Sequence, residues 1–419
     1  MKRWLWGSLL SVAMTSPLLA GEVCQHGIYG VAGKQVVISS KADGSPVYTF
    51  VDGRHDKANT GVAPVRCEGD QVTVSDDRGT FQSWPRLPYS ETPMRFMSHG
   101  ATLSGVLIEP PDRQNKHPLV VFVHGSERSS AMGFYYPYTL AALGLTVVVY
   151  DKRGTGSSEG EYTQNFELLA DDAAAALDEG RRMAKGRYSR AGYFGGSQGG
   201  WVAPLAARRS HADFVSVGFG LVLSPQEEDQ EQVAEELSEA GASAVVKAKA
   251  REVTDATGAV ISSHLSSGYD KLEGVKRKYG NEAWFGSIHG EYTGKLLHES
   301  ESDLRRVGAA LYDTVGLIWN YDALSSLQQV QVPQLWVLAG DDREAPGNLT
   351  EERLKGLIGG GKPIDVYVFP HTDHGIYEFV QNPDGTRKYT RIADGYFQLL
   401  GDWIKQTPGA SYGQAIKMK

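Results

Sequence analysis

Short apolar runs and amphipathic stretches alternate along the chain from about residue 94 onward. The runs 119–123 and 145–150 are apolar at nearly every position, which is typical of strands buried on both faces. The stretch 166–183 carries apolar residues at helical spacing, with Asp171 and Asp172 on its other side. The same pattern predicts a leading hairpin at 95–98 and 101–109, strands at 191–194, 219–223, 334–338 and 365–369, and a closing helix at 391–404. Strand and helix in repetition predict an α/β fold, a mostly parallel sheet with helices on both faces.

Two regions depart from this rhythm. Residues 21–92 are rich in Gly, Val, Thr and Asp and alternate over short stretches, which predicts a small N-terminal β domain. Residues 226–325 are mostly polar and helical, including an amphipathic stretch at 301–319, and predict a helical cap inserted between two parts of the core, 93–225 and 326–419. We interpret the acidic start of this cap, 227–231, as a solvated helix face rather than a binding surface.

The first twenty residues have the layout of a signal peptide. Lys2 and Arg3 precede an apolar stretch that small residues and Pro17 interrupt. A membrane anchor is the alternative, but the run is at the short limit for a span. Lipid attachment at Cys24 is disfavoured because the residues before it are not small. We therefore predict cleavage of 1–20, a periplasmic or secreted protein, and no stable membrane insertion afterwards.

Charge and cysteine content narrow the possible partners. The formal net charge of -8 disfavours nucleic acid as a partner. Export places Cys24 and Cys67, the two cysteines of the chain, in an oxidising compartment. We predict that they form a disulfide, which contributes about 4 kcal/mol in the chain-entropy model; two free buried thiols are the alternative.

The strongest chemical signal is the segment Gly-Gly-Ser-Gln-Gly-Gly at 195–200. It contains G-x-S-x-G between a predicted strand and a predicted helix, which is the context of a nucleophilic serine. Glycines are needed on both sides because the turn is crowded and its dihedrals are strained. We predict Ser197 as the nucleophile, at the N-terminus of a helix whose dipole favours negative charge.

A second signal, His124-Gly125-Ser126, follows the strand at 119–123. A loop in this place supplies one backbone donor to a tetrahedral oxyanion. We predict the N–H groups of Ser126 and Gln198 as the two donors. His124 itself is expected to brace the loop by hydrogen bonding rather than to act as the base.

The base and the acid are expected after the last two strands, where two candidates compete for each role. His374 is preferred over His371 because the short loop after the strand lets it reach back over the sheet edge, and Gly375 permits close approach. Asp342 is preferred over Asp341 as the carboxylate that orients the imidazole. The predicted triad is Ser197, Asp342 and His374.

Together these motifs resemble the α/β-hydrolase superfamily, in particular bacterial serine carboxylesterases with a helical cap, which are distantly similar to acyl-peptide-releasing enzymes. The resemblance covers about 95–225 and 325–405, and includes the segment Tyr-Asp-Lys-Arg-Gly-Thr-Gly at 150–156. In such relatives this segment is a structural loop beside the oxyanion hole. Glu127 stands where those esterases often have glycine, which implies a narrower and more acidic loop.

The favoured function is hydrolysis of a small-molecule carboxylic ester through an acyl-enzyme. An exopeptidase or a thioesterase with the same triad remains an alternative, as does a non-catalytic binding protein on the same scaffold. No metal or organic cofactor is implied, because cysteines are too few for a thiolate site and no phosphate-cradling G-x-x-x-x-G-K motif is present.

Overall fold

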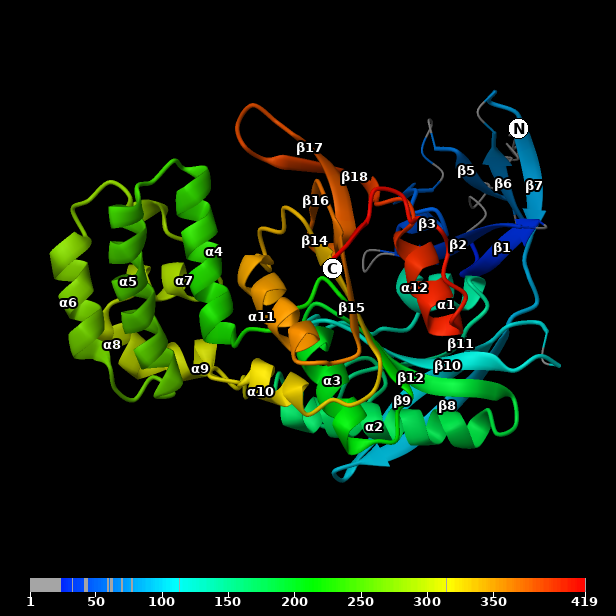
Figure 1. Cartoon of the computed structure of the whole chain (residues 1–419), viewed down its shortest axis with the longest axis horizontal. Coiled ribbons are helices and arrows are strands. Elements are labelled where there is room, and N and C mark those ends of the chain that lie inside the picture. Colours follow the sequence, from blue (N-terminus) through cyan, green and yellow to red (C-terminus); the bar gives the residue numbers. More distant parts are fainter. Residues whose placement is uncertain are drawn as a thin grey trace, which may run out of the picture.

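A nine-stranded sheet forms the centre of the protein (Figure 1). The computed structural model describes residues 24–418 except 32, 41–43, 59, 61–62, 69–70, 77, 113 and 314. The strands lie in the order β19-β15-β14-β13-β12-β10-β11-β9-β8, and those from β15 to β11 are parallel to one another. Their bounds are β8 Ser90–Ser98, β9 Ala101–Glu109, β10 His117–Val123, β11 Thr146–Tyr150, β12 Tyr188–Gly196, β13 Phe214–Gly218, β14 Gln334–Ala339, β15 Ile364–Phe369 and β19 Ile416–Lys417.

Helices cover both faces of this sheet, and a separate apolar cluster fills each interface. The side chains of Leu119, Val121 and Val123 on β10 belong to one cluster, whereas Val120 and Phe122 belong to the other, as the two-residue period of a strand requires. Helices α2 Phe166–Met183, α3 Gly199–Arg209, α10 Ala323–Gln328 and α11 Asn348–Gly359 pack on the first face, and α1 Tyr135–Ala142 and α12 Tyr396–Lys405 pack on the second. The predicted α/β fold is confirmed.

Three expectations about individual segments are wrong. The strand expected at 219–223 is β13, Phe214–Gly218; residues 219–223 form a loop whose leucines and valine are buried, and a buried loop has the same apolar pattern as a buried strand. The helix expected from 391 begins at Tyr396, because 387–392 form the strand β18 Arg387–Ile392. This strand pairs with β17 Tyr377–Gln381, which in turn pairs with the short strand β16 Thr372–Asp373. Asp172 is fully buried against Arg153, with Nη2 2.6 Å from its carboxylate, instead of facing solvent.

The N-terminal region forms two small antiparallel sheets. One is β1 Gly27–Val31, β2 Lys34–Ser40, β3 Pro46–Phe50 and β4 His55–Lys57, and the other is β5 Val65–Glu68, β6 Gln71–Ser75 and β7 Phe81–Pro85. A disulfide joins Cys24 to Cys67, with Cα atoms 5.2 Å apart. The region contacts α1, and the N–H of Ile392 donates to the carbonyl of Gly53 at 2.9 Å. The predicted signal peptide, 1–20, lies outside the described residues.

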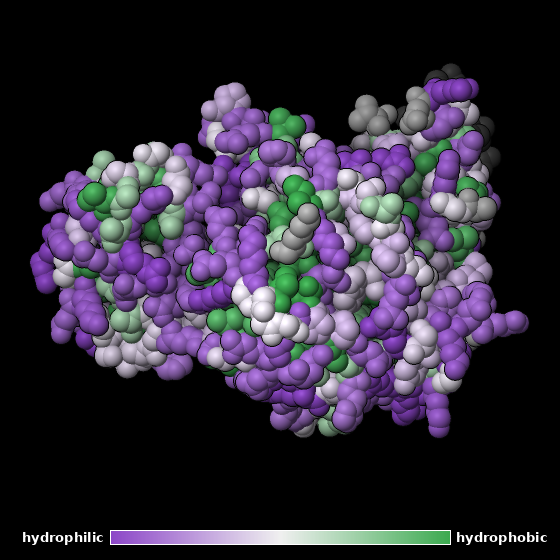
Figure 2. All heavy atoms as spheres, viewed as in Figure 1, coloured by the Kyte–Doolittle hydropathy of each residue, from purple (hydrophilic) through white to green (hydrophobic). Residues whose placement is uncertain are grey.

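A helical insertion separates β13 from β14 and has its own apolar cluster (Figure 1). It contains α4 Pro225–Glu239, α5 Ala244–Ser262, α6 Tyr269–Tyr279, η1 Phe285–Ser287, α7 Thr293–His298, α8 Glu301–Asp303, η2 Leu304–Gly308 and α9 Ala309–Tyr312. The amphipathic stretch 301–319 is therefore a series of short turns rather than one helix. On the face drawn in Figure 2, hydrophilic residues cover most of this insertion, with apolar ones scattered among them. Among the described helices, none has the length and apolar character that crossing a membrane requires.

Candidate active site

Ser197 lies on the sharp turn between β12 and α3, and its backbone has a left-handed φ of 52°. This conformation is strained for a residue with a side chain, and such strain persists where the surrounding structure enforces it. A Cβ atom on Gly199 would lie 2.4 Å from the carbonyl oxygen of Val123, and one on Gly195 would lie 2.2 Å from that of Gly199. The glycines of the motif therefore let the turn pack directly against β10 and hold the Ser197 side chain at the carboxyl edge of the sheet.

His374 and Asp342 form a hydrogen-bonded pair at the same edge. The Nδ1 atom of His374 lies 3.0 Å from Oδ2 of Asp342 and 3.2 Å from Oδ1. Asp342 is buried, and its Oδ1 also accepts from the backbone N–H groups of Glu344 at 3.0 Å and Ala345 at 2.7 Å. These bonds fix the carboxylate, which in turn fixes the orientation of the imidazole.

The competing residues form a pair of their own, away from this site. His371 is 3.5 Å from Asp341, and its side chain is 87% exposed. Its backbone has a left-handed φ of 55°, so the loop turns the ring outward. The structure thus brings Asp342 together with His374 and leaves Asp341 and His371 at the surface.

The ring of Phe219 lies close both to Gly196, which precedes Ser197, and to His374. A Cβ atom on Gly196 would lie 2.8 Å from the Phe219 ring, and the His374 ring centroid is 5.0 Å from that of Phe219. Among the described residues, no hydrogen bond joins Oγ of Ser197 to Nε2 of His374, which instead lies 3.6 Å from Oε1 of Glu344. Such bonds often form only when substrate is present.

The loop that carries His374 is held by Asp373, which the sequence did not single out. Its carboxylate accepts from the backbone N–H groups of His374 at 2.9 Å and Arg343 at 3.0 Å. It also pairs with Arg387 at 2.7 Å and accepts from the Tyr389 hydroxyl at 3.0 Å, both on β18. These contacts depend on the β17–β18 hairpin, whose turn contains the sequence Asn-Pro-Asp-Gly at 382–385, a recognisable turn signal.

The predicted oxyanion loop after β10 is braced by the segment at 150–156. The buried ammonium of Lys152 donates to the carbonyl of Gly125 at 2.6 Å, and the hydroxyl of Tyr162 donates to the carbonyl of Ser126 at 2.5 Å. His124 lies 3.6 Å from Glu127 and braces the loop from within. Burial lowers the pKa of Lys152 to about 8, with Glu127 opposing this shift.

Both predicted oxyanion donors line the pocket of Ser197. Within the part of the chain that the structure describes, neither the N–H of Ser126 nor that of Gln198 has an intramolecular acceptor. Gln198 directly precedes α3, so its N–H is one of the unpaired donors of a helix N-terminus. Two free donors at this point suit a developing negative charge.

The far wall of this pocket is acidic. The empty space of the pocket is about 540 Å³, including some open solvent. Glu228, Gln232, Glu291 and Glu344 line it together with Ser197. The expectation of a solvated face at 227–231 is wrong for Glu228, which is half-buried and lines the pocket. Glu227 has the structural role, since it completes a capping box with Ser224 and pairs with Arg353 at 2.6 Å.

These carboxylates act on His374. Burial of the ring lowers the pKa of His374, but the charges of Asp342, Glu344 and Glu228 and the hydrogen bond that the ring donates to Asp342 raise it more, to about 9. Burial also raises the pKa of Glu228 well above its usual range. The arrangement thus stabilises a positive charge at the position of the predicted base.

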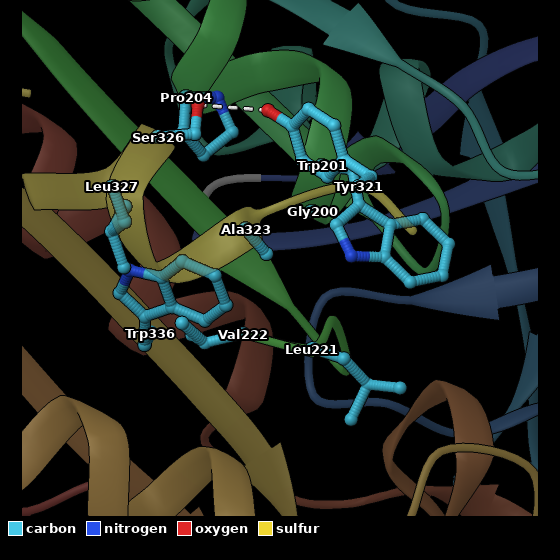
Figure 3. A pocket seen from close by; sticks show the side chains of 10 residues that line it. All are labelled: Gly200, Trp201, Pro204, Leu221, Val222, Tyr321, Ala323, Ser326, Leu327 and Trp336. Carbon is cyan, nitrogen blue, oxygen red and sulfur yellow. Dashed lines mark hydrogen bonds between the residues drawn. The ribbon is translucent and has the colours of Figure 1, made fainter. Parts of the chain in front are cut away.

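A second cavity lies behind α3 (Figure 3). Mostly apolar side chains line it, including Trp201, Leu327 and Trp336, and the Tyr321 hydroxyl donates to Ser326 at 2.8 Å. It has room for no more than about one water molecule. Trp201 also lines the pocket of Ser197, and its indole N–H donates to the carbonyl of Leu223 at 2.7 Å.

Within the described residues, no group of three His, Cys, Asp or Glu side chains is arranged to hold a metal ion.

Comparison with known proteins gives a consistent class. The family model described as serine aminopeptidase, S33, matches residues 114–263, which include β10, the Ser197 turn and the first part of the insertion. Over these residues the chain is similar to this family of serine hydrolases, and its fold is that of the α/β-hydrolases. A comparison with curated proteins found no match.

Solved structures with similar folds include three hydrolases. An acylaminoacyl peptidase from Pyrococcus horikoshii is 14% identical with a TM-score of 0.46, and the alignment covers 92% of this chain but only 57% of the peptidase. An esterase from Pyrococcus furiosus is 16% identical (TM-score 0.38; 68% and 84% covered), and an α/β-hydrolase from a Penicillium species is 17% identical (TM-score 0.42; 68% and 91% covered). This chain therefore spans little more than half the length of the peptidase.

Proposed function

We propose that this protein is a serine hydrolase that cleaves small-molecule carboxylic esters, with Ser197 as nucleophile, His374 as base and Asp342 as the orienting carboxylate. The left-handed turn of Ser197 carries this proposal, because it places a hydroxyl group at the sheet edge where the His374–Asp342 pair also lies. A strained serine between a strand and a helix is typical of a nucleophile turn.

In the proposed reaction, Nε2 of His374 takes the proton of Ser197 as Oγ bonds to the ester carbonyl carbon. The N–H groups of Ser126 and Gln198 then stabilise the negative oxygen of the tetrahedral intermediate. The carbon–oxygen bond to the alcohol breaks, and the alcohol leaves with the proton from His374. Water attacks the acyl-enzyme with His374 again as base, and the carboxylic acid is released.

We also propose that the protein is exported and acts in the periplasm or outside the cell. The disulfide between Cys24 and Cys67 supports this location, because structural disulfides persist mainly in oxidising compartments. The layout of residues 1–20 supports it as well.

A fluorophosphonate probe and three substrates test the proposed function. The probe is expected to label the wild-type protein at Ser197 and not the Ser197→Ala variant. Matched butyryl ester, thioester and anilide substrates are compared by kcat/KM, and the ester is expected to be the best of them. Ser197→Ala should reduce kcat by about 10⁴-fold or more. The unfolding temperature of this variant is the control for correct folding. If the probe does not label the wild-type protein and no substrate is hydrolysed, the proposal of a hydrolase fails and a binding protein on this scaffold is the remaining interpretation.

A further inference from the structure

The ester hydrolysis proposed above assigns no substrate contact to the acidic wall of the Ser197 pocket. Glu228, Glu291 and Glu344 come from three different segments, α4, the loop before α7 and the loop after β14, and all three line the same pocket. Among the residues that line the pocket there is no Lys, Arg or His. Three acidic side chains converge from separate segments on one pocket, and burial raises the pKa of two of them, Glu228 and Glu344, so their charged forms are disfavoured unless a cation is bound.

Partners within the protein do not neutralise this wall. In the described part of the chain, the side chain of Glu228 has neither an ion pair nor a hydrogen bond. Glu291 pairs only with Lys295 at 3.3 Å, and both of these side chains are half exposed to solvent. Glu344 has Nε2 of His374 as its nearest cation, at 3.6 Å.

Two buried glutamines give an independent indication of a ligand. Gln198 and Gln232 are only 4% and 6% exposed, and both line the pocket. The Oε1 atom of each is buried without a hydrogen-bond partner in the described structure. A buried acceptor without a donor is costly unless a ligand supplies one. The pocket thus offers two amide oxygens and three carboxylates to a ligand that donates hydrogen bonds.

A bare metal ion does not satisfy these groups, because no three acidic side chains among the described residues are arranged around one point. A protonated amine does, because it carries a positive charge and several N–H donors at the end of a flexible carbon chain.

The position of Glu344 shows which part of the substrate carries this charge. In the proposed reaction Nε2 of His374 gives its proton to the oxygen of the departing alcohol, so the alcohol lies beside Nε2. Glu344 is 3.6 Å from that nitrogen, and the charge of Glu228 acts on the same ring. A cation held by these carboxylates is therefore attached to the alcohol rather than to the acyl group.

We propose that the preferred substrate is an ester of an amino alcohol, whose protonated amine binds against Glu228 and Glu344 with Glu291 at the pocket mouth. This inference rests on the proposed function. It also gives Glu344 a second role: a bound ammonium group replaces the imidazole as the partner of this carboxylate and leaves Nε2 of His374 free for Ser197. Hydrolysis then releases a carboxylic acid and a protonated amino alcohol.

An isosteric pair of esters tests the proposal. 2-(Dimethylamino)ethyl butyrate is protonated at neutral pH, whereas 3-methylbutyl butyrate has the same shape without charge. Release of butyric acid is followed by titration at constant pH, and the ratio of the two kcat/KM values is the readout. The wild-type ratio is expected to exceed about 10, since truncating one partner of a half-buried charge pair commonly costs tenfold or more.

Glu228→Gln and Glu344→Gln are each expected to lower this ratio about tenfold. Glu352→Gln, which removes the same charge from an exposed position on α11, is the matched control and should leave the ratio unchanged. Thermal unfolding shows that each variant is folded.

Equal kcat/KM values for the two esters in the wild type would overturn the proposal, as would a ratio that neither glutamine variant changes. A preference for ethyl 4-aminobutyrate over ethyl pentanoate, without one for the amino alcohol ester, would place the cation on the acyl side and also overturn it. Hydrolysis of the neutral ester in either case leaves the proposed function standing. If no ester is hydrolysed and the fluorophosphonate does not label Ser197, the proposed function itself has failed.

Discussion

The two walls of the Ser197 pocket are built from different kinds of structure and carry different charge. The wall on the sheet side supplies Ser126, Ser197 and Gln198. The charged groups of the adjoining loops contact the protein itself: Lys152 donates to the carbonyl of Gly125, and Glu127 lies 3.6 Å from His124. The opposite wall, from the insertion and the loop after β14, leaves Glu228 without a partner among the described residues and Glu344 next to His374. The charged groups that adjoin the first wall are paired without substrate, whereas Glu228 of the second wall is not.

This difference separates chemistry from specificity within one pocket. Groups that are already paired position the backbone donors in the same way for every substrate. Groups that remain unpaired gain an interaction only with a substrate of suitable charge, and they discriminate against one without it. Changes in the first wall should therefore affect all esters alike, while changes in the second should affect the ratio between esters.

The largest expected effect comes from the pair of histidines that the loop after β15 separates. His374→Ala should reduce kcat/KM for butyryl esters by about 10⁴-fold or more, because the proposed general base is lost. His371→Ala is the matched control, since that ring is 87% exposed and pairs only with Asp341. Turnover of the neutral ester measures both. An inactive His371→Ala protein beside an active His374→Ala protein would reverse the assignment.

The sequence predicted the first wall well and the second poorly, for physical reasons. Ser197, Gly125 and Lys152 lie on short segments directly after buried strands, so their positions follow from strand pattern and turn chemistry. The sheet, its two helical layers and the disulfide could be predicted for the same reasons of pattern and composition.

The second wall depends on tertiary packing that no local pattern specifies. Glu227 and Glu228 are neighbours in one acidic run, yet one caps α4 and the other lines the pocket. Which face of α4 turns toward Ser197 is decided by how the insertion packs on the core. Likewise, the support of Asp373 by Arg387 depends on the β17–β18 hairpin, which the sequence did not predict; its last two residues, 391–392, were assigned to the closing helix.

An intermediate effect is expected from the sheet wall. Lys152→Met removes the ammonium group that donates to the carbonyl of Gly125, so the oxyanion loop loses a brace and kcat should fall about tenfold. The loss should be equal for the amino alcohol ester and its neutral isostere, with KM nearly unchanged. Affinity for a trifluoromethyl ketone, which mimics the tetrahedral intermediate, should fall in parallel, a result that mere destabilisation would not give.

Arg128→Met is the control for this variant, because Arg128 lies over the same Tyr162 ring, 4.6 Å from its centroid, without a hydrogen bond to the oxyanion loop. A loss of activity confined to the cationic ester in Lys152→Met would contradict the separation of the two walls.

The smallest expected effect is a shift in pH dependence. His374 acts as a base only when neutral, and its pKa is raised to about 9 by Asp342, Glu344 and Glu228 against the lowering effect of burial. For the neutral ester, kcat/KM should therefore increase with pH and level off above about pH 9. Glu344→Gln removes one of the three carboxylates, so the midpoint should move down and kcat/KM at pH 7 should rise about threefold. Glu352→Gln is the control and should leave the midpoint in place. An upward shift of the midpoint in Glu344→Gln would mean that this carboxylate does not stabilise the protonated imidazole. The two walls would then act on the chemistry in the same way.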